Sequence, residues 1–389
     1  MPPFSFVRHN CLMENYSKHI AIIGAGISGL TLGNILKKNN VPCVIFERHQ
    51  DVSEYGAGIS ISPNGLSVLE ELNLLQNIKN ISGNPKNAIF YSNLKRITQI
   101  DVNVVTTSRK SLYKVLLDKY IAMNGEIFFN HELIDFNLDN KSILFSNNLS
   151  YQVSHIAACD GIRSICREKF TNKTQPTYSG YSVWRAILNK QQAEIRFHLG
   201  SNFHVVTYPI SDKKTSFVAA IKTDKEQKDS WKQKGSIKDL ELDLPIEIIQ
   251  EYKSLKENDY IYKWGVYIRP KIDLLFKENI SFLGDAAHPI VPFIGQGGCL
   301  ALEDASIFGN LVSLYKNDYP KIQESYKRIR LPRIRKINNA SILQGRLNHI
   351  KNPIIKTIRN FMMRYTNIIS INTNKIWKYN PSSEIKKIV

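Results

Sequence analysis

Apolar runs and helical repeats alternate near the start of the chain. Residues 19–23 form an apolar run that is too short for a helix and is ended by Gly24, so they predict a buried parallel strand. Apolar residues then recur with the spacing of a helix over residues 30–36, and residues 41–46 predict a second strand. We therefore expect a βαβ unit with a right-handed crossover.

The middle of the chain changes from helix to sheet. Residues 56–62 predict an extended segment, residues 65–74 a helix, and residues 109–123 a longer helix with one apolar face. Residues 126–159 then show short alternating strands joined by Asn-rich turns, which is typical of a β-meander. A second β-rich block follows, with its clearest strands at residues 182–188, 194–198, 204–209 and 216–221.

Helix returns toward the C-terminus. A short apolar strand at residues 280–283 precedes helices at residues 298–314 and 320–347. Because strand-rich sequence separates this part from the βαβ unit, we expect a discontinuous nucleotide-binding domain with the block between as an inserted domain. The predicted fold class is α/β.

The chain is strongly basic, with 52 Lys and Arg residues against 34 Asp and Glu residues and a net charge of +18. Such a charge is compatible with nucleic acid, anionic lipid or an acidic substrate as a partner. Lys, Ile and Asn are abundant along the whole chain, however, so much of the charge is compositional, and no known nucleic-acid motif accompanies it. We expect no nucleic-acid partner. Residues 327–364 contain many Lys and Arg and no acid, which predicts a solvated helical face, or at most peripheral membrane contact.

The cysteines and the N-terminal region indicate the cellular compartment in which the protein is expected. The five cysteines are scattered and form no C-x-x-C pair, which predicts reduced thiols in a cytoplasmic protein and no metal site. No apolar stretch approaches the roughly 18–20 residues of a membrane-spanning helix, and residues 1–12 lack the apolar core of a signal peptide. Met13 is an alternative start, so we expect residues 1–12 to be a disordered extension.

The six residues that follow the first predicted strand form a G-x-G-x-x-G motif. Gly24 permits a tight turn, Gly26 lets the backbone approach a pyrophosphate, and Gly29 permits close packing of helix on strand. The following helix offers unpaired N–H groups and a positive dipole to phosphates. Glu47 ends the second strand, where a carboxylate accepts hydrogen bonds from a ribose diol. The motif predicts a dinucleotide, without deciding between FAD and NAD.

A second glycine-rich segment follows the strand predicted at residues 280–283. Asp285 lies at the end of that strand, where a carboxylate can hold polyol hydroxyls. Gly295, Gly297 and Gly298 then precede a helix whose N-terminus can stabilise negative charge on a nearby ring. Since reduced flavin is an anion, this segment favours FAD.

Together these motifs resemble those of the class A flavoprotein monooxygenases, the para-hydroxybenzoate hydroxylase-like group, and look most like its salicylate hydroxylase and 3-hydroxybenzoate 6-hydroxylase branch. The resemblance covers nearly the whole chain. The matching segments are residues 24–29, 47–48, 56–65, 109–112, 159–167, 284–305, 330–335 and 377–380.

The resemblance implies a discontinuous Rossmann-like FAD-binding domain, an inserted β-sheet substrate domain and a C-terminal helical region. The expected FAD-binding domain comprises residues 13–82, 104–173 and 271–345, the substrate domain residues 83–103 and 174–270, and the helical region residues 346–389. A single G-x-G-x-x-G leaves no separate domain for NADH or NADPH, which is expected to bind transiently.

The resemblance also implies which residues contact FAD. The pyrophosphate would be cradled by Gly24, Gly26, Ser28 and Gly29, with Asp160 nearby. The adenosine ribose would be held by Glu47, with Arg48 and Gly58 as further contacts of the cofactor. On the flavin side, Arg109 would contact the cofactor, Asp285 would hold the ribityl chain, and the isoalloxazine edge would lie against Gly295, Gly297 and Gly298.

The implied reaction is hydroxylation of a small phenolic or carboxylated aromatic substrate by NAD(P)H and O2, through a flavin C4a-hydroperoxide that must be kept from water. His204 and Tyr208 are four residues apart on one predicted strand and so share a face. A His with a near-neutral pKa can act as a base toward the substrate phenol. Gln296 beside the flavin is a further candidate, and Arg185 can pair with a substrate carboxylate. The alternative is that His204 and Tyr208 are ordinary half-buried sheet residues.

Other functions remain open from the sequence. Residues 295–299 also look like those of zeaxanthin epoxidase, and quinone-biosynthesis hydroxylases share the motif at residues 284–288, so an isoprenoid substrate is one alternative. A non-catalytic binding protein of the same fold, as in the GDP-dissociation inhibitors, is another. A third is an FAD reductase or dehydrogenase that never forms the peroxide. A homodimer is also left open.

Overall fold

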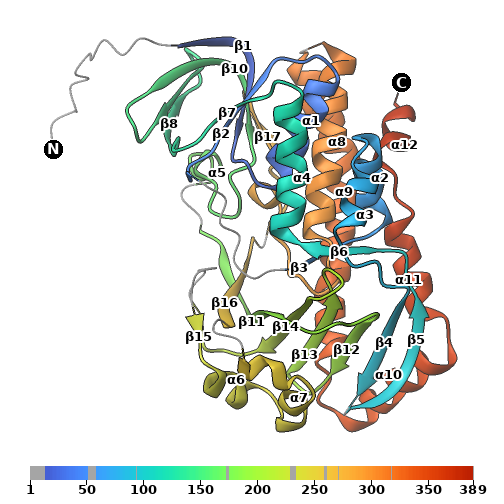
Figure 1. Cartoon of the computed structure of the whole chain (residues 1–389). Helices are drawn as coiled ribbons and strands as arrows, with labels where there is room; N and C mark the ends of the chain where they lie inside the picture. The colour runs from blue at the N-terminus through green and yellow to red at the C-terminus, as the bar shows by residue number, and fades with distance from the viewer. Residues whose placement is uncertain are drawn as a thin grey trace.

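The computed structural model of the chain describes residues 14–50, 58–92, 94–171, 175–227, 234–257, 261–269, 271–316 and 318–388. The extension expected at residues 1–12 and the first two residues of the extended segment expected at 56–62 lie outside these ranges. Two large sheets lie one above the other, and long helices run along one side of them (Figure 1).

The first sheet joins segments from the two ends of the predicted nucleotide-binding domain. Its strands are β1 (Glu14–Ile23), β2 (Cys43–Phe46), β7 (Glu126–Phe128), β8 (Leu133–Asn137), β9 (Ser142–Phe145), β10 (Ser150–Ala158), β17 (Phe276–Lys277) and β18 (Ile280–Phe282). They are arranged in the order β17-β18-β10-β1-β2-β7, and β8 and β9 extend from β10. The pairs from β18 to β7 are parallel, as expected for strands buried on both faces.

The β-meander predicted for residues 126–159 is confirmed for β8, β9 and β10 but is wrong for β7 and for the other neighbours of β10. Only β8, β9 and β10 pair antiparallel, whereas β7 pairs in parallel with β2 and β10 lies in parallel between β1 and β18. The last four residues of β10 are all buried. A strand apolar on both faces belongs inside a covered parallel sheet, and the alternation of short strands alone does not reveal that partner.

Helices cover the first sheet. They include α1 (Ile27–Lys38), α2 (Pro63–Glu71), α3 (Leu75–Asn80), α4 (Arg109–Ala122), α5 (Ile165–Glu168) and α8 (Gly297–Tyr315). α1 packs between α4 and α8, so the two halves of the chain share one core. The helix predicted at residues 109–123 is confirmed. α2 begins two residues earlier than predicted, because a proline fits the first position of a helix.

The second sheet is mostly antiparallel. Its strands are β4 (Asn87–Ser92), β5 (Lys95–Asp101), β11 (Thr177–Leu188), β12 (Ile195–Leu199), β13 (Phe203–Pro209), β14 (Thr215–Lys222), β15 (Lys234–Gly235) and β16 (Ile261–Ile268), in the order β15-β16-β11-β14-β13-β12-β4-β5. The four strands predicted between residues 182 and 221 are all present. One side is covered by elements that the sequence did not predict: α6 (Ile237–Asp243), α7 (Ile246–Glu251) and the 3-10 helix η1 (Lys253–Glu257).

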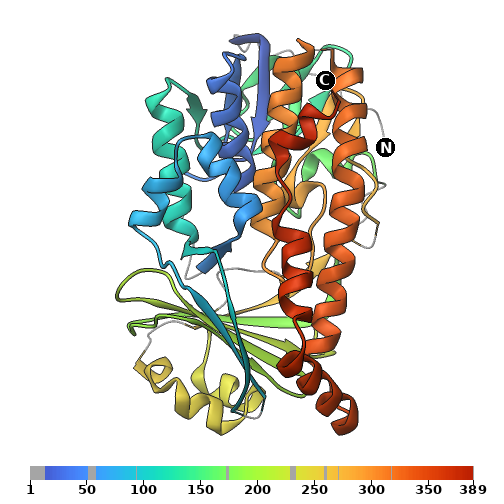
Figure 2. The same ribbon diagram turned by 90° about the vertical axis from the view of Figure 1, so that its right-hand side faces the viewer.

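Four helices end the chain: α9 (Tyr319–Asn348), α10 (Pro353–Tyr365), α11 (Ile368–Trp377) and α12 (Pro381–Lys386). Figure 2 shows α9 running along the molecule from the first sheet to the second. The helix predicted at residues 320–347 is confirmed. Among the described residues, none of the helices combines the length and the apolar character needed to cross a membrane. The domain boundaries given above stay a prediction.

Candidate active site at three parallel strand ends

Three parallel strands end side by side at one edge of the first sheet. Ile23 of β1 is paired with Ala158 of β10, and Ala158 is paired with Phe282 of β18. The turns that follow these strands are therefore neighbours, although they begin near residues 24, 159 and 283. Ligands of such sheets bind outside the carboxyl ends of the strands.

The first turn has the geometry that its glycines predict. Gly24 has φ of +101°, and a Cβ there would lie 2.6 Å from the carbonyl oxygen of Cys159. A Cβ at Gly29 would lie 1.9 Å from the carbonyl oxygen of Gly24. Gly26 differs, because a Cβ there would meet no other heavy atom of the described residues within 4 Å. No side chain caps α1 at Gly26, so its first N–H groups can bind an anion.

The second glycine-rich segment touches the first. Gly284, in the 3-10 turn η2 (Gly284–Ala286), has φ of +58°, and a Cβ there would lie 3.2 Å from Cβ of Ser28 and 3.4 Å from Cβ of Ala301. Asp285 is exposed, although every other residue from 281 to 289 is buried. One dinucleotide can therefore contact both segments.

Two acidic side chains lie at the same edge. Glu47 is buried; its Oε2 accepts a hydrogen bond from N of Ala25 (2.8 Å) and its Oε1 accepts one from N of His49 (3.0 Å). Asp160 accepts one from N of Cys166 (3.3 Å), but its Oδ1 is buried without a hydrogen-bond partner among the described residues. Burial raises the pKa of Asp160, against the opposing effect of its hydrogen bonds. An open glycine cradle beside an unsatisfied buried oxygen fits a dinucleotide with hydroxyl groups.

Residues 17–341, most of the chain, match the family described as FAD binding domain. The chain belongs to this family.

This flavoprotein is 24% identical over 367 residues to the 3-amino-4-hydroxybenzoate 2-monooxygenase of Streptomyces cremeus, covering 89% of this chain and 92% of that protein. It is 21% identical over 372 residues to the 3-hydroxybenzoate 6-hydroxylase of Klebsiella oxytoca, covering 88% and 91%.

Solved structures share the fold of the flavoprotein. Klebsiella pneumoniae HpxO complexed with FAD and uric acid has a TM-score of 0.79 and 21% identity, covering 91% of this chain and 95% of that one. P. aeruginosa PqsL in complex with 2-aminobenzoylacetate has a TM-score of 0.74 and 16% identity, covering 86% and 97%. The predicted α/β fold, the resemblance to the class A flavoprotein monooxygenases and FAD as the cofactor are confirmed.

The remaining residues expected to contact FAD lie around the same edge. Arg109 begins α4 directly after Ser108, which is paired with Gly58 between the strands β3 (Gly58–Ile61) and β6 (Val105–Ser108). Gly295 and Gly297 have open space where a Cβ would stand, whereas a Cβ at Gly298 would lie 2.5 Å from Ile59. Arg48 is exposed, and its Nε donates a 3.2 Å hydrogen bond to Nε2 of His49. The role of each residue toward FAD stays a prediction.

A buried ionic network, which sequence reasoning did not identify, joins α8 to α9. Glu303 and Asp304 are fully buried in α8. Arg330 donates from Nη1 to Glu303 and from Nε to Asp304, each at 2.7 Å. Arg333 donates from Nη2 to Glu303 at 2.9 Å. The available signal was a pair of acids in an otherwise apolar helix, together with two arginines three residues apart in the next one.

The same network reaches the turn at Gly284. Asp304 Oδ2 accepts a hydrogen bond from N of Gly284 (2.9 Å) and lies 2.5 Å from Nε2 of His288. Burial alone would raise the pKa of Asp304, but His288 and Arg330 outweigh it and lower this pKa to about 2. The carboxylate therefore stays ionised at neutral pH and holds the Gly284 turn in place.

Gln296 belongs to the supporting network. Its side chain is buried, its Oε1 accepts a 2.9 Å hydrogen bond from Nδ2 of Asn64, and its Nε2 donates a 2.8 Å hydrogen bond to Oγ of Ser62. Because both ends of the amide are used, this geometry supports positioning of the loop before α8. A direct catalytic role for Gln296 stays a prediction.

Arg185 and Tyr208 of the second sheet meet Gly58. Nη1 of Arg185 donates a 2.9 Å hydrogen bond to the carbonyl oxygen of Gly58. A Cβ at Gly58 would lie 2.6 Å from Cβ of Ser216 and 2.7 Å from the Tyr208 ring. Two of the four expected catalytic residues are thus brought together.

His204 lies farther along the same face, about 13 Å from Tyr208 at the usual rise of a strand. It is buried, and its Nδ1 lies 2.7 Å from Nε2 of His349, at the end of α9. The ring of Phe293, from the loop before α8, is 5.4 Å away. Burial, and then the charge of His349, lower the pKa of His204 well below 6.5, so the expected near-neutral pKa is wrong.

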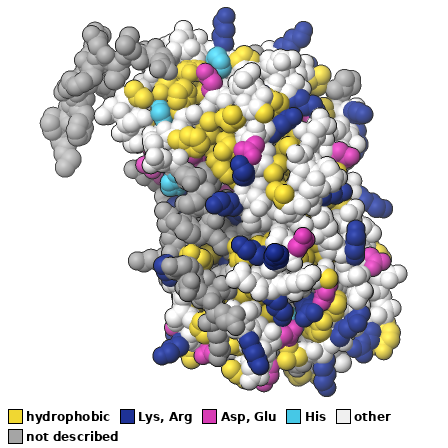
Figure 3. Space-filling view, in the orientation of Figure 1, with side chains coloured by type: hydrophobic (Ala, Val, Ile, Leu, Met, Phe, Trp, Pro, Cys, Tyr) yellow, Lys and Arg dark blue, Asp and Glu magenta, His cyan; other side chains and the backbone are white. Residues whose placement is uncertain are grey.

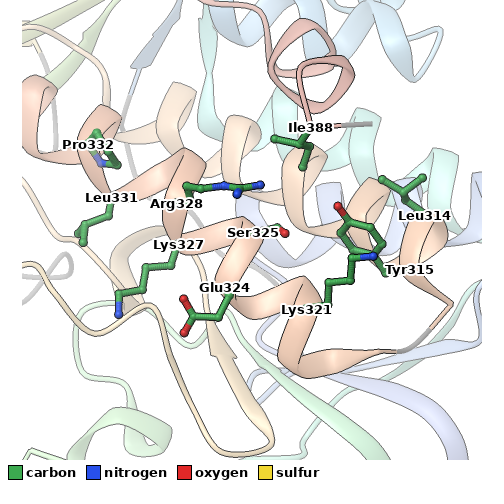
Figure 4. Close-up of a pocket in the computed structure, with 10 residues that line it drawn as sticks. All are labelled: Leu314, Tyr315, Lys321, Glu324, Ser325, Lys327, Arg328, Leu331, Pro332 and Ile388. Atoms are coloured by element: carbon green, nitrogen blue, oxygen red, sulfur yellow. The ribbon is translucent and has the colours of Figure 1, made fainter.

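A surface groove of about 900 Å³ lies elsewhere on the flavoprotein (Figure 4). It is lined by the last turn of α8, at Leu314 and Tyr315, by α9 and by Ile388. Leu314 is 17 residues beyond Gly297, the first residue of α8, which corresponds to about 26 Å along the helix. The groove is therefore separate from the strand ends that form the candidate active site.

Proposed function

We propose that this flavoprotein is a monooxygenase that uses NAD(P)H and O2 to hydroxylate a small phenolic or carboxylated aromatic substrate. The two relatives described above are named for hydroxybenzoate substrates, and each is matched over about nine-tenths of its length. Transient binding of the nicotinamide, a cytoplasmic location and the residue roles listed for FAD belong to the same proposal.

The observation that carries the proposal is the contact of the second sheet with Gly58 of β3 and with the loop before α8. Val183, Ala220 and Val266 of this sheet form one buried apolar cluster with Val291 and Phe293 of the loop before α8. Arg185 and His204 lie on the same side of the sheet, at Gly58 and Phe293 respectively. In this proposal a substrate binds beside this cluster, with apolar side chains, Arg185 and His204 as its neighbours.

FAD supplies the oxidative chemistry when bound, so the chain's own residues orient the substrate and exclude water. In this proposal Arg185, which donates to the carbonyl oxygen of Gly58, offers its guanidinium to a substrate carboxylate, because a guanidinium can bind a carboxylate through two parallel N–H donors. The apolar cluster around Phe293 keeps water from the ring to be oxidised.

His204 acts in this proposal as a hydrogen-bond acceptor toward the substrate phenol. Its Nδ1 is held by His349, and no described residue forms a hydrogen bond with its Nε2. The pKa of His204 lies well below that of a phenol, which is about 10. Complete proton transfer to the imidazole is therefore unfavourable, but a hydrogen bond to Nε2 still increases electron density on the ring.

The test is a screen of phenols and benzoates for stimulated NAD(P)H oxidation, with analysis of the products. We expect at least one compound to accelerate oxidation and to be recovered with one added oxygen atom from O2. Reduction of external acceptors without oxygen incorporation would indicate a reductase instead. Purified protein without flavin absorbance would favour the non-catalytic alternative.

A further inference from the structure

α10 is an amphipathic helix whose apolar side faces away from the protein. Six of its large apolar side chains are 40% to 70% exposed: Ile354, Ile355, Ile358, Phe361, Met362 and Tyr365. Their spacing of one, three or four residues places them on one side of the helix. We call these six residues the α10 apolar face.

The opposite side of α10 is polar and attaches the helix to the protein. Arg359 is buried, and its Nη1 donates a 2.9 Å hydrogen bond to the carbonyl oxygen of Leu347 at the end of α9. Nη2 of Arg364 donates a 3.0 Å hydrogen bond to the carbonyl oxygen of Arg96 in β5. The helix is therefore fixed through its basic residues, and its apolar face is left at the surface.

The exposed apolar residues are concentrated in this part of the molecule. Seven of the seventeen large apolar side chains that are exposed in the described residues lie between Ile354 and Ile371. A contiguous exposed apolar patch marks an interaction site far better than scattered apolar residues do. A solvated face of Lys and Arg, as expected for residues 327–364, does not account for this apolar patch on α10.

Charge distinguishes between the kinds of partner that could cover this face. Residues 325–383 contain thirteen Lys and Arg and no Asp or Glu. Lys351, Arg364 and Lys375 are exposed close to α10 in the sequence, and Lys and Arg side chains are spread over the face of the molecule shown in Figure 3. Two copies of the chain joined through this region would bring like charges together, whereas an anionic lipid surface attracts them.

We propose that α10 docks this protein on the surface of an anionic phospholipid membrane. The α10 apolar face enters the boundary between headgroups and acyl chains, and Lys351 and Lys375 contact anionic headgroups. α10 has 13 residues, so it is about 20 Å long and lies in the plane of the membrane. Figure 2 shows the C-terminal helices reaching the same end of the molecule as the second sheet.

The test is co-sedimentation of the full-length holoprotein with vesicles of phosphatidylcholine, either alone or with about one-third phosphatidylserine. We expect binding to the phosphatidylserine vesicles at low salt and at least about tenfold weaker binding to phosphatidylcholine alone. Binding should also fall by at least about tenfold near 1 M salt, where the screening length is only about 3 Å. No binding to the phosphatidylserine vesicles would overturn the proposal.

Substitutions locate the docking surface. The triple variant Ile354→Ser, Ile358→Ser, Phe361→Ser should bind phosphatidylserine vesicles at least about tenfold less tightly. The matched control Leu242→Ser, Ile246→Ser removes two exposed apolar side chains from α6 and α7 and should bind as the unsubstituted chain does. Flavin content and thermal stability should be unchanged in both, because none of these residues belongs to the core.

Two further results would overturn the proposal. The first is equal vesicle binding by the triple variant and the unsubstituted chain. The second is an oligomer in size-exclusion chromatography that the triple variant dissociates, without vesicle binding by either form, since the α10 apolar face would then belong to a contact between copies of this chain.

Discussion

Asn64 and Glu303 are 239 residues apart in the chain, yet Nδ2 of Asn64 donates a 2.6 Å hydrogen bond to Oε1 of Glu303. The same amide nitrogen is 2.9 Å from Oε1 of Gln296. Arg330 and Arg333 neutralise the Glu303 carboxylate from the other side. Glu303 thus holds the start of α2 through Asn64 and holds α9 through the two arginines, and Asn64 extends the network to the loop before α8.

Arg330→Met should destabilise the protein strongly. The substitution leaves Glu303 and Asp304 with one fewer cation in a fully buried site, and breaking such a pair costs about 3–5 kcal/mol. Urea unfolding followed by flavin and tryptophan fluorescence measures the loss. Lys336→Met is the matched control, because Lys336 is an exposed residue of the same helix. A similar stability for the two variants would contradict the assigned importance of the network.

Gly26→Ala should reduce FAD affinity without unfolding the protein. Gly26 has φ of −70°, which any residue adopts, and a Cβ there meets no other described atom within 4 Å. The added methyl group therefore points where a pyrophosphate would lie, and we expect FAD to bind at least about tenfold less tightly, a change of about 1.4 kcal/mol. Titration of the apoprotein with FAD measures the affinity, and circular dichroism monitors the fold. Normal FAD affinity would remove Gly26 from the cofactor site.

Asp285→Ala should weaken flavin retention. Asp285 is the exposed residue of an otherwise buried segment at a parallel strand end, where a carboxylate can hold hydroxyl groups of the cofactor. Loss of a hydrogen bond to a charged group corresponds to about 1.5–3 kcal/mol. The ratio of flavin to protein absorbance after gel filtration is the measurement, with Asp212→Ala, between β13 and β14, as an exposed acidic control. Full flavin occupancy in Asp285→Ala would contradict this assignment.

Local patterns in the sequence predicted the parts of the fold that depend on neighbouring residues. The turn at Gly24 and the helix from Arg109 follow from glycine geometry and apolar spacing, and both are confirmed. The sequence did not show which distant strands pair with each other. The alternating sequence of β10 looks the same whether its neighbour is parallel or antiparallel, so its central place between β1 and β18 was missed.

In the candidate site, too, local motifs could be predicted from the sequence and contacts between distant segments could not. The glycine segments around residues 24 and 284 could be assigned to one ligand because each motif is local. Their contact through Ser28, and the pairing of His204 with His349 across 145 residues, depend on how the domains pack. The lowered pKa of His204 follows from burial, which the sequence of one strand does not give.

Burial of His155 should make the stability depend on pH. His155 is fully buried between Asn279 and Ser281, and burial is the main cause that lowers its pKa to about 3. Below about pH 6.5 the unfolded chain binds a proton that the folded chain excludes, so stability falls by about 1.4 kcal/mol per pH unit until the folded pKa is reached. His155→Gln should remove that part of the slope in urea unfolding between about pH 6 and about pH 4. The exposed His49→Gln should keep it, and an unchanged slope in His155→Gln would contradict the prediction.

His204→Ala should separate oxygenation from flavin binding. The side chain faces Phe293 and His349 and has no described contact with the glycine segments, so FAD content should be normal. Without the acceptor at Nε2 the phenol is less activated, and we expect hydroxylation to slow by about 10²-fold, with more peroxide released per NAD(P)H oxidised. His198→Ala is the control, because His198 is a buried histidine of the same sheet that is hydrogen-bonded instead to Tyr252.

The pH profile gives a second criterion for His204. Since its pKa is lowered well below 6.5, the imidazole stays neutral and able to accept a hydrogen bond at every pH above that value. If His204 activates the substrate, the fraction of NAD(P)H oxidation that leads to hydroxylation should therefore not change with pH from pH 6.5 upward. This fraction should decline only in more acidic solution. A loss of coupling centred near neutral pH in the unsubstituted protein, or normal coupling in His204→Ala, would each show that another group activates the substrate.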